Sequence, residues 1–99
     1  MLTSKQRAAL RGAANPLEPV FQIGKGDIDE ALVQALEDCI AARELIKVKV
    51  LETSACEPRE AAVLLAERLH ADCVQVIGRK FVLFKQKKKE SAFDAILAK

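Results

Sequence analysis

Apolar residues recur at helical spacing in three segments of the chain. The first opens with Thr3 and Gln6, which have the spacing of a capping box, and Asn15-Pro16 stops it because the residue before proline disfavours helical geometry. One side of this predicted helix carries Ala9, Leu10, Ala13 and Ala14. The pattern therefore indicates a short amphipathic helix at the start of the chain.

The second helical segment has Asp27 as its predicted N-cap, and Glu30 completes a capping box. Its apolar stripe, which we expect to face a sheet, consists of Ile28, Leu32, Leu36, Cys39 and Ile40. The third segment begins near Pro58, a residue suited to a first helical turn, and ends at Ala71-Asp72. Its core stripe consists of Ala62, Leu65, Ala66 and Leu69.

Shorter apolar runs between these segments indicate strands. Residues 20–23 form the first run, and residues 44–50 alternate in a way that separates two faces. Ile46, Val48 and Val50 would face a core, whereas Lys47 and Lys49 would lie on a polar face. Residues 73–77 and 81–85 then form a predicted hairpin, with Gly78 free to adopt a positive φ in the turn.

The order of these elements, α-β-α-β-α-β-β, predicts a single α/β domain. Helical crossovers would make the first three strands parallel, and the hairpin would return the fourth strand antiparallel, which gives a mixed four-stranded sheet. A chain of 99 residues with 51% apolar side chains can bury a core without disulfides or metals. We expect a cytoplasmic protein, because no run could span a bilayer and the first residues lack the apolar core of a signal peptide.

Residues that usually carry chemistry are few. Cys39, Cys56 and Cys73 lie far apart and form no C-x-x-C pair, so neither a disulfide framework nor a zinc site is indicated, and the first and last fall on apolar faces. His70 follows a helix, where contact with solvent or the helix dipole explains it better than catalysis. We find no nucleophile and base pair and no nucleotide-binding motif, so we expect no enzyme, cofactor or small-molecule substrate.

Charge is distributed unevenly along the chain. Residues 1–26 carry four lysines and arginines against one acid, residues 27–72 five against eleven, and residues 73–99 seven against two. The basic ends could fold into one surface that binds phosphates, or they could serve solubility alone. The acidic middle part contains two of the predicted helices, whose outer faces are then solvated or contact a partner.

The glycine-rich segment Gly24-Lys25-Gly26-Asp27 connects the first strand to the second helix. Such a turn can bring the backbone close to a phosphate while Lys25 supplies charge, but an ordinary loop with a solvated lysine has the same composition. The four residues alone favour the ordinary loop.

A longer set of motifs runs through most of the chain. It consists of Leu2-Thr3-Ser4-Lys5-Gln6-Arg7, Leu10-Arg11, Leu17-Glu18-Pro19-Val20, Ile23-Gly24-Lys25-Gly26, Glu44-Leu45-Ile46-Lys47-Val48-Lys49-Val50 and Val74-Gln75-Val76-Ile77-Gly78. Together these segments resemble the YhbY family of bacterial RNA-binding proteins, the stand-alone form of the CRM domain named for chloroplast RNA splicing and ribosome maturation. They appear in the family's order, and the resemblance covers Leu2 to Lys85.

The resemblance implies a mixed four-stranded sheet with three helices, similar to the C-terminal domain of bacterial translation initiation factor three. It also implies binding to structured RNA, in particular ribosomal RNA in precursors of the large ribosomal subunit. The family's G-x-x-G loop falls on residues 24–27, where Asp27 replaces the fourth glycine and brings a negative charge to the place that a phosphate would approach. Where the family often closes its last strand with tyrosine-arginine, this chain has Phe84-Lys85, which keeps a ring and a cation.

Our leading hypothesis is a monomeric, non-catalytic RNA-binding protein, with residues 1–85 as a CRM-like domain and residues 86–99 as a basic tail that has room for a short helix. The candidate RNA-binding residues are Lys5, Arg7, Arg11, Gly24, Lys25, Gly26, Lys47, Lys49, Arg79, Lys80 and Lys85. Phe84, with Phe81 and Phe21 as further candidates, could stack on bases, although apolar strands more often bury such rings, so recognition of RNA shape is favoured. The alternative is a protein-interaction module that docks on a ribosomal or other partner protein through its acidic helices.

Overall fold

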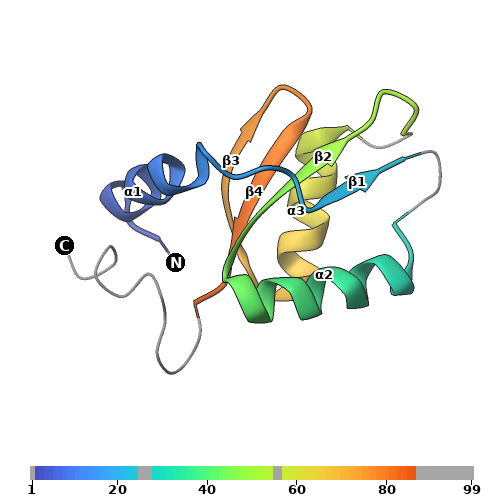
Figure 1. Cartoon of the computed structure of the whole chain (residues 1–99), viewed down its shortest axis with the longest axis horizontal. Helices are drawn as coiled ribbons and strands as arrows, with labels where there is room; N and C mark the ends of the chain where they lie inside the picture. The colour runs from blue at the N-terminus through green and yellow to red at the C-terminus, as the bar shows by residue number, and fades with distance from the viewer. Residues whose placement is uncertain (1, 25–27, 55–56, 87–99) are drawn as a thin grey trace.

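The predicted order of elements is confirmed in the computed structural model, which describes residues 2–24, 28–54 and 57–86 (Figure 1). The elements are α1 (Ser4–Ala14), β1 (Phe21–Ile23), α2 (Glu30–Arg43), β2 (Leu45–Val50), α3 (Pro58–Leu69), β3 (Asp72–Ile77) and β4 (Lys80–Phe84). The predicted tail, apart from residue 86, lies outside the described residues, as does Cys56. No described helix has the length and apolar character needed to cross a membrane.

The four strands form one mixed sheet in the order β1-β2-β4-β3. β1 pairs with β2 in parallel, and β4 is antiparallel to both of its neighbours, β2 and β3. The prediction that the first three strands share a direction and the fourth reverses it is therefore confirmed. The structure adds that β4, the last of the described strands, lies between β2 and β3.

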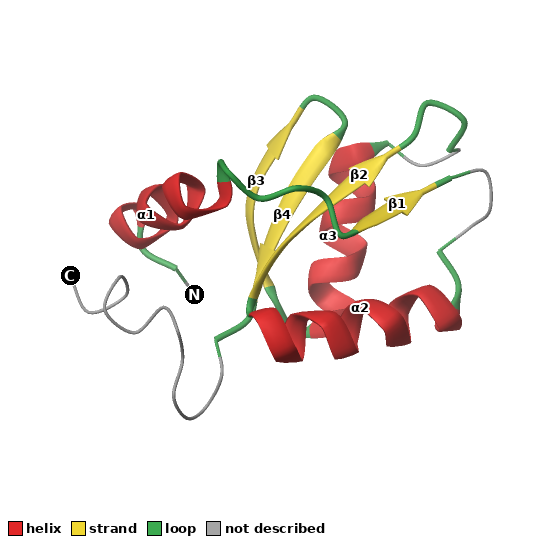
Figure 2. Ribbon diagram, viewed as in Figure 1, coloured by secondary structure: helices red, strands yellow, loops and turns green. Residues whose placement is uncertain are grey.

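The larger core lies between one face of the sheet and the helices α2 and α3 (Figure 2). Ile46, Val48 and Val50 of β2 are buried in it, as the alternation predicts, and Phe81 and Leu83 of β4 join them. The helices contribute apolar stripes that include Leu36 and Ile40 of α2 and Ala62, Leu65 and Leu69 of α3. These residues fix the position of both helices on the same side of the sheet.

A second, smaller core forms on the opposite face of the sheet, where α1 packs. Leu10 and Ala14 of α1 are fully buried there against Leu45, Val74, Val82 and Phe84. The prediction that this face is polar is therefore wrong at one end, because Leu45 shares its face with Lys47 and Lys49 and is covered by α1. Ala9 was placed on the buried side of this helix but is exposed.

The ends of the helices agree only partly with the prediction. Thr3 and Gln6 form the expected capping box, with reciprocal hydrogen bonds of 3.1 and 3.0 Å. The N-cap of α2 is Asp29 rather than Asp27: the Asp29 carboxylate accepts a 2.8 Å hydrogen bond from the Leu32 amide, and Ile28 packs on the core from just before the helix. Asp27 lies outside the described residues.

Helix α2 passes into β2 without a loop. Glu44 makes the transition with a φ of 66°, and its amide donates a 2.8 Å hydrogen bond to the Ile40 carbonyl. This residue is buried and precedes the strand, which begins at Leu45 rather than at Glu44. His70 ends α3 in the left-handed region and is exposed, in line with the expected position at a helix end.

Candidate nucleic-acid interface

Three lysines lie on the same sheet face as α1, on the part that α1 does not cover. Lys49 of β2 is directly opposite Lys80 of β4, and Lys47, two residues before Lys49, is opposite Val82. Because side chains alternate along a strand, Lys47, Lys49 and Lys80 project from one face. We call this surface the lysine face; Lys80 is exposed and the other two lysines are half-buried.

The lysine face is hollowed where it meets the end of α1. A depression of about 190 Å³ lies there, lined by Asn15, Lys47, Gln75, Ile77, Lys80 and Val82. Asn15 comes from the C-cap of α1, and the other residues come from β2, β3 and β4. The depression thus joins two predicted site lysines to polar side chains that the sequence did not single out.

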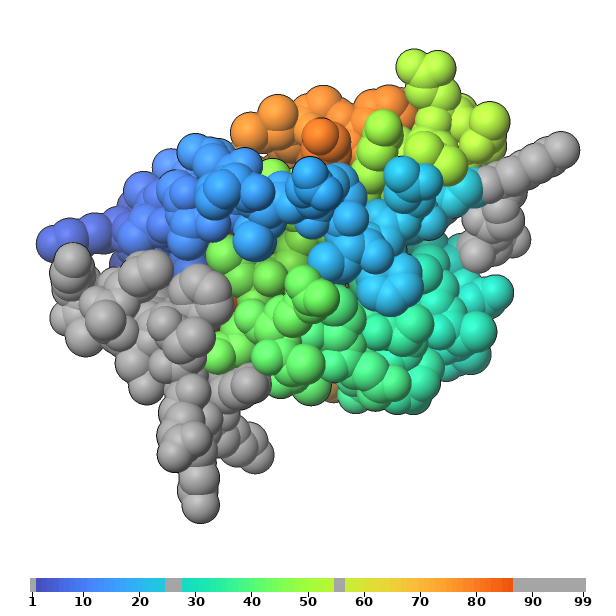
Figure 3. Space-filling view, in the orientation of Figure 1, coloured from blue at the N-terminus to red at the C-terminus, as the bar shows by residue number. Residues whose placement is uncertain are grey.

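The other end of the lysine face leads to a wider groove at the end of β2. It measures about 500 Å³ and is lined by Lys49, Val50, Leu51, Glu52, Thr53 and Arg79. Figure 3 shows the tip of the β3–β4 hairpin and the segment after β2 along the same edge of the molecule. Gly24 borders this region, since the Leu51 amide donates a 2.9 Å hydrogen bond to the Ile23 carbonyl. Lys25 and Gly26, the two other RNA-binding candidates of that loop, lie outside the described residues.

Arg79 anchors the hairpin to the end of β2. Its Nε donates a 2.8 Å hydrogen bond to the Val50 carbonyl, and a terminal nitrogen donates one of 2.7 Å to the Leu51 carbonyl. In return, the Val50 amide donates a 2.7 Å bond to the Arg79 carbonyl. The guanidinium has five N–H groups, so these two bonds leave part of it for a phosphate, but its position is set by the protein itself.

The basic residues of α1 are divided between two roles. Lys5 and Arg11 are exposed, whereas Arg7 is half-buried and donates a hydrogen bond from a terminal nitrogen to the Cys73 carbonyl of β3. Arg7 thus fastens α1 to the edge of the sheet. Lys85 lies beyond the end of β4, where its backbone amide donates a 2.9 Å hydrogen bond to the Glu44 carbonyl. Lys49 and Lys80 pair at the opposite end of β2 and β4, so the structure does not bring Lys85 together with them.

The aromatic rings do not offer a stacking platform among the strands. Phe84 is 2% exposed and Phe81 is fully buried, because each packs into one of the two cores. The hypothesis that Phe84 or Phe81 stacks on bases is therefore wrong. Phe21 is half-buried and packs against the larger core.

Cysteine side chains play a packing role in the described part of the chain. Cys39 and Cys73 are half-buried against the larger core, which agrees with their predicted places on apolar faces. Burial raises the pKa of the Cys73 thiol, and the positive charges of Arg7 and Arg59 partly oppose this shift. The described residues contain no group of three histidine, cysteine or acidic side chains that could hold a metal ion.

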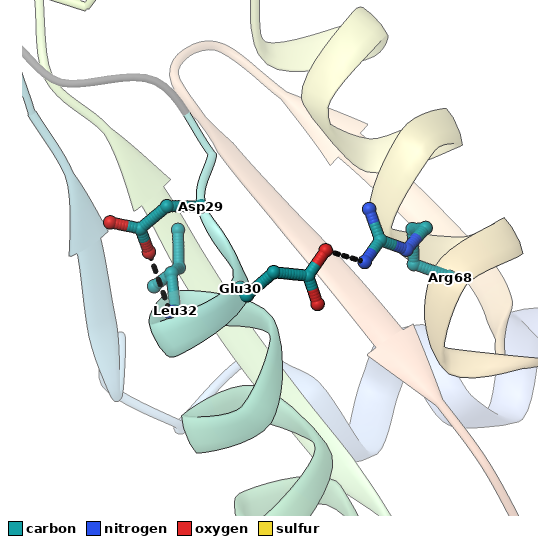
Figure 4. A network of polar contacts seen from close by, with 4 residues as sticks. All are labelled: Asp29, Glu30, Leu32 and Arg68. Carbon is teal, nitrogen blue, oxygen red and sulfur yellow. Dashed lines mark hydrogen bonds and ion pairs between the residues drawn. The ribbon is translucent and has the colours of Figure 1, made fainter.

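The surface of α2 and α3 differs sharply from the lysine face. Arg68 and Glu30 join the two helices through an ion pair of 2.6 Å, shown in Figure 4. Exposed acids on these helices include Glu37, Asp38, Glu60 and Glu67, and α3 also exposes Val63 and Leu64, by 53% and 41%. The helical side of the molecule therefore exposes acidic and apolar side chains, whereas the lysine face exposes basic ones.

Sequence reasoning missed Asn15, Gln75 and Ile77 as members of the candidate site. Asn15 was interpreted only as a helix stop, and Gln75 and Ile77 only as strand residues. Alternation across the predicted hairpin places Ile77 opposite Lys80 and Gln75 opposite Val82, so this signal could have found both residues; the register shifts only beyond Gln75, toward Cys73.

Comparison with known proteins gives a consistent result. The chain is 36% identical over 94 residues to the "Probable RNA-binding protein YqeI" of Bacillus subtilis, which covers 95% of this chain and 98% of that protein. It is 31% identical over 84 residues to an "RNA-binding protein" of Haemophilus influenzae, with 85% of each chain covered. The solution structure of SAV1595 from Staphylococcus aureus matches with a TM-score of 0.78 and 41% identity, over 92% of this chain and 95% of that one.

The family assignment rests on the full length of the fold described above. The sequence profile of the CRS1 / YhbY (CRM) domain matches residues 2–85, which include all the helices and strands that the structure describes. The resemblance seen in the sequence motifs is thereby confirmed, as is the α/β fold. This chain belongs to the CRS1 / YhbY (CRM) domain family.

Proposed function

We propose that this chain is a non-catalytic, monomeric RNA-binding protein of the cytoplasm and that residues 1–85 form its RNA-binding unit. The observation that carries the proposal is the register that places Lys47, Lys49 and Lys80 on the uncovered part of one sheet face. Membership of the CRM family and the names of the relatives, which are given as RNA-binding proteins, support it.

The lysine face would contact phosphates of a structured RNA. Each lysine that neutralises a phosphate releases bound counterions, so affinity falls as salt rises. The exposed Lys5 and Arg11 would extend the contact along α1, and Arg79 would add a cation held in place by its bonds to the Val50 and Leu51 carbonyls. Lys25 and the glycines beside it would supply the contact at the loop after β1.

A salt titration tests this proposal. The affinity of the full chain for an RNA hairpin is measured at salt concentrations from about 50 to about 300 mM. Counterion release makes the affinity depend steeply on salt over this range. A variant with Lys47→Gln, Lys49→Gln and Lys80→Gln should bind much more weakly, and its salt slope should fall by about two to three. The control replaces two arginines on the helical side of the sheet, Arg43 and Arg59, by glutamine. It removes two positive charges against the three of the test variant and should leave the slope close to that of the wild type.

Two results would contradict the lysine face as the RNA contact. One is a triple variant with wild-type affinity and slope, and the other is a control that loses as much binding as the triple variant. A wild-type chain that binds the hairpin no better than an unrelated protein of the same net charge would contradict RNA binding as a whole.

The biological RNA that we propose is ribosomal RNA in precursors of the large ribosomal subunit. This step rests on the family resemblance of the sequence motifs. Sedimentation of cell extract tests it: the chain should travel with large-subunit precursors at low salt, and the triple lysine variant should stay at the top of the gradient. A wild-type chain found only in the soluble fractions would contradict this target.

A second candidate function is docking on a basic ribosomal protein through α2 and α3. The exposed Val63 and Leu64 among acidic side chains favour it, since apolar residues framed by charge often mark interaction surfaces. Replacement of both by serine should abolish binding to a purified large-subunit ribosomal protein and leave the RNA salt slope unchanged. Unchanged binding to such proteins would remove this candidate.

A further inference from the structure

The depression on the lysine face combines three kinds of contact within a small space. Carboxamide groups come from Asn15 and Gln75, aliphatic surface from Ile77 and Val82, and positive charge from Lys47 and Lys80. Among the described residues, no acidic side chain lines it. A phosphate backbone needs only the positive charge of the lysine face. The depression adds hydrogen-bonding groups and apolar surface to that charge.

The two carboxamides are held by the fold but have free hydrogen-bonding capacity. Asn15 ends α1, where its amide donates to the carbonyls of Arg11 and Gly12 at 3.1 and 3.4 Å. Gln75 is fixed opposite Val82 after the register shift in β3. Within the described part of the chain neither side chain makes a hydrogen bond, so each can present donors and an acceptor to a ligand.

The apolar part of the depression suits the face of a planar ring. Val82 is buried and forms part of the floor, and Ile77 is 60% exposed on the neighbouring strand. A ligand that covers Ile77 removes this apolar surface from water, which favours binding.

The size of the depression limits the ligand to a single ring system. Its volume of about 190 Å³ lies below the ~300 to 1,000 Å³ typical of pockets for drug-sized molecules. Lys47 and Lys80 belong to the lysine face as well, so a ring held here can stay attached to a backbone whose phosphates lie along that face.

We propose that this depression binds one unpaired nucleobase of the structured RNA, with Asn15 and Gln75 pairing with its edge. A paired base cannot enter, because A-form RNA keeps its bases stacked and its major groove is too deep and narrow for side chains to read. A bulged or looped base can be turned out of the stack and present both its edge and its face. The inference rests on the proposed RNA-binding function and adds to it a selective contact at one nucleotide.

The test compares five RNA hairpins that differ at one position. One is fully paired, and the others carry a single bulged A, C, G or U. The wild type should bind at least one bulged hairpin about tenfold more tightly than the paired one, the effect expected of one well-placed pair of hydrogen bonds to a base. Gln75→Met and Asn15→Ala should each reduce this preference to about threefold or less, while affinity for the paired hairpin and its salt slope stay unchanged.

Gln22→Met is the matched control. Gln22 pairs with Lys49 in the sheet and is exposed, but it does not line the depression. This variant should keep the full preference for the bulged hairpin, and thermal unfolding should show that all three variants are folded.

The possible failures are distinguishable. If the wild type binds paired and bulged hairpins equally with a salt slope that depends on the lysines, the nucleobase site is refuted and the proposed function stands. Preference that survives both Gln75→Met and Asn15→Ala also refutes the site. If no hairpin is bound at all, the proposed function itself fails.

Discussion

Replacement of Lys49 by glutamine should stabilise the domain while weakening its hold on RNA. Lys49 and Lys80 are direct cross-strand partners on the lysine face. Like charges in such positions destabilise an antiparallel pair, because their Cβ atoms lie only about 5 Å apart. The arrangement thus carries a cost in the free protein that a phosphate would remove.

The size of this cost follows from the exposure of the pair. Two unit charges ~7 Å apart in water repel by ~0.6 kcal/mol, and physiological salt reduces this value. We therefore expect Lys49→Gln to raise the free energy of unfolding by about 0.3 to 0.6 kcal/mol at low salt. For a domain of this size the melting temperature should rise by about 2 to 4 °C.

The assay is thermal and urea unfolding of four proteins: wild type, Lys49→Gln, Lys80→Gln and the double variant. If the repulsion between the two lysines is the cause, either single change should give nearly the whole gain and the second should add little. In 1 M salt, where the Debye length is ~3 Å, the gain should disappear. RNA affinity should move the other way, with the salt slope reduced by about one for each lysine removed.

Strictly additive gains would refute this reasoning, because they would show that each lysine acts on stability independently of the other. A gain that persists in 1 M salt would also refute it and point to strand propensity or packing instead of charge. A gain in stability without any loss of RNA affinity would separate Lys49 from the proposed interface.

Three further results are expected. Leu10→Ala should cost about 3 kcal/mol in urea unfolding, since Leu10 is fully buried between α1 and the sheet, and a cost below ~1 kcal/mol would mean that α1 is not docked. Gly78→Ala should cost about 1 to 2 kcal/mol because Gly78 has a φ of 58°, and an unchanged urea midpoint would contradict the turn geometry. Burial raises the pKa of Cys73 above its ordinary value of 9.0, so the native state favours the thiol; its contribution is present below pH 9.0 and is lost as the pH rises through the higher native pKa. Above pH 9.0 the urea midpoint should therefore fall more steeply in the wild type than in Cys73→Ala, and parallel curves would contradict the raised pKa.

The sequence patterns predicted the larger core well because they have a period. Ile46, Val48 and Val50 alternate with lysines, and Leu36 and Leu65 lie on helical stripes, so each core residue is supported by its neighbours in the pattern. The smaller core was missed for the opposite reason. Nothing in the spacing around Leu45 shows that a distant helix, placed by Leu10, will cover one end of an otherwise basic face.

Of the candidate site, only the lysines were predicted. Alternation alone places Lys47 and Lys49 together, but charge alone cannot show that Arg7 and Arg79 are bonded to backbone carbonyls of distant segments. The pairing of Gln75 with Val82 follows from the hairpin register, whereas the contribution of Asn15 depends on where α1 ends relative to the sheet, which is a property of the assembled fold.

The central position of β4 has a consequence for synthesis on the ribosome. Of the described strands, β4 emerges last, yet it supplies Phe81 and Leu83 to one core and Val82 and Phe84 to the other, and it is the strand that joins β3 to β2. A nascent chain that has emerged only to residue 79 therefore has neither core complete, whatever local helices it has formed. Cooperative folding should begin only when residue 84 has left the exit tunnel, so a release mutant truncated within β4 should be degraded rather than accumulate as a partial domain.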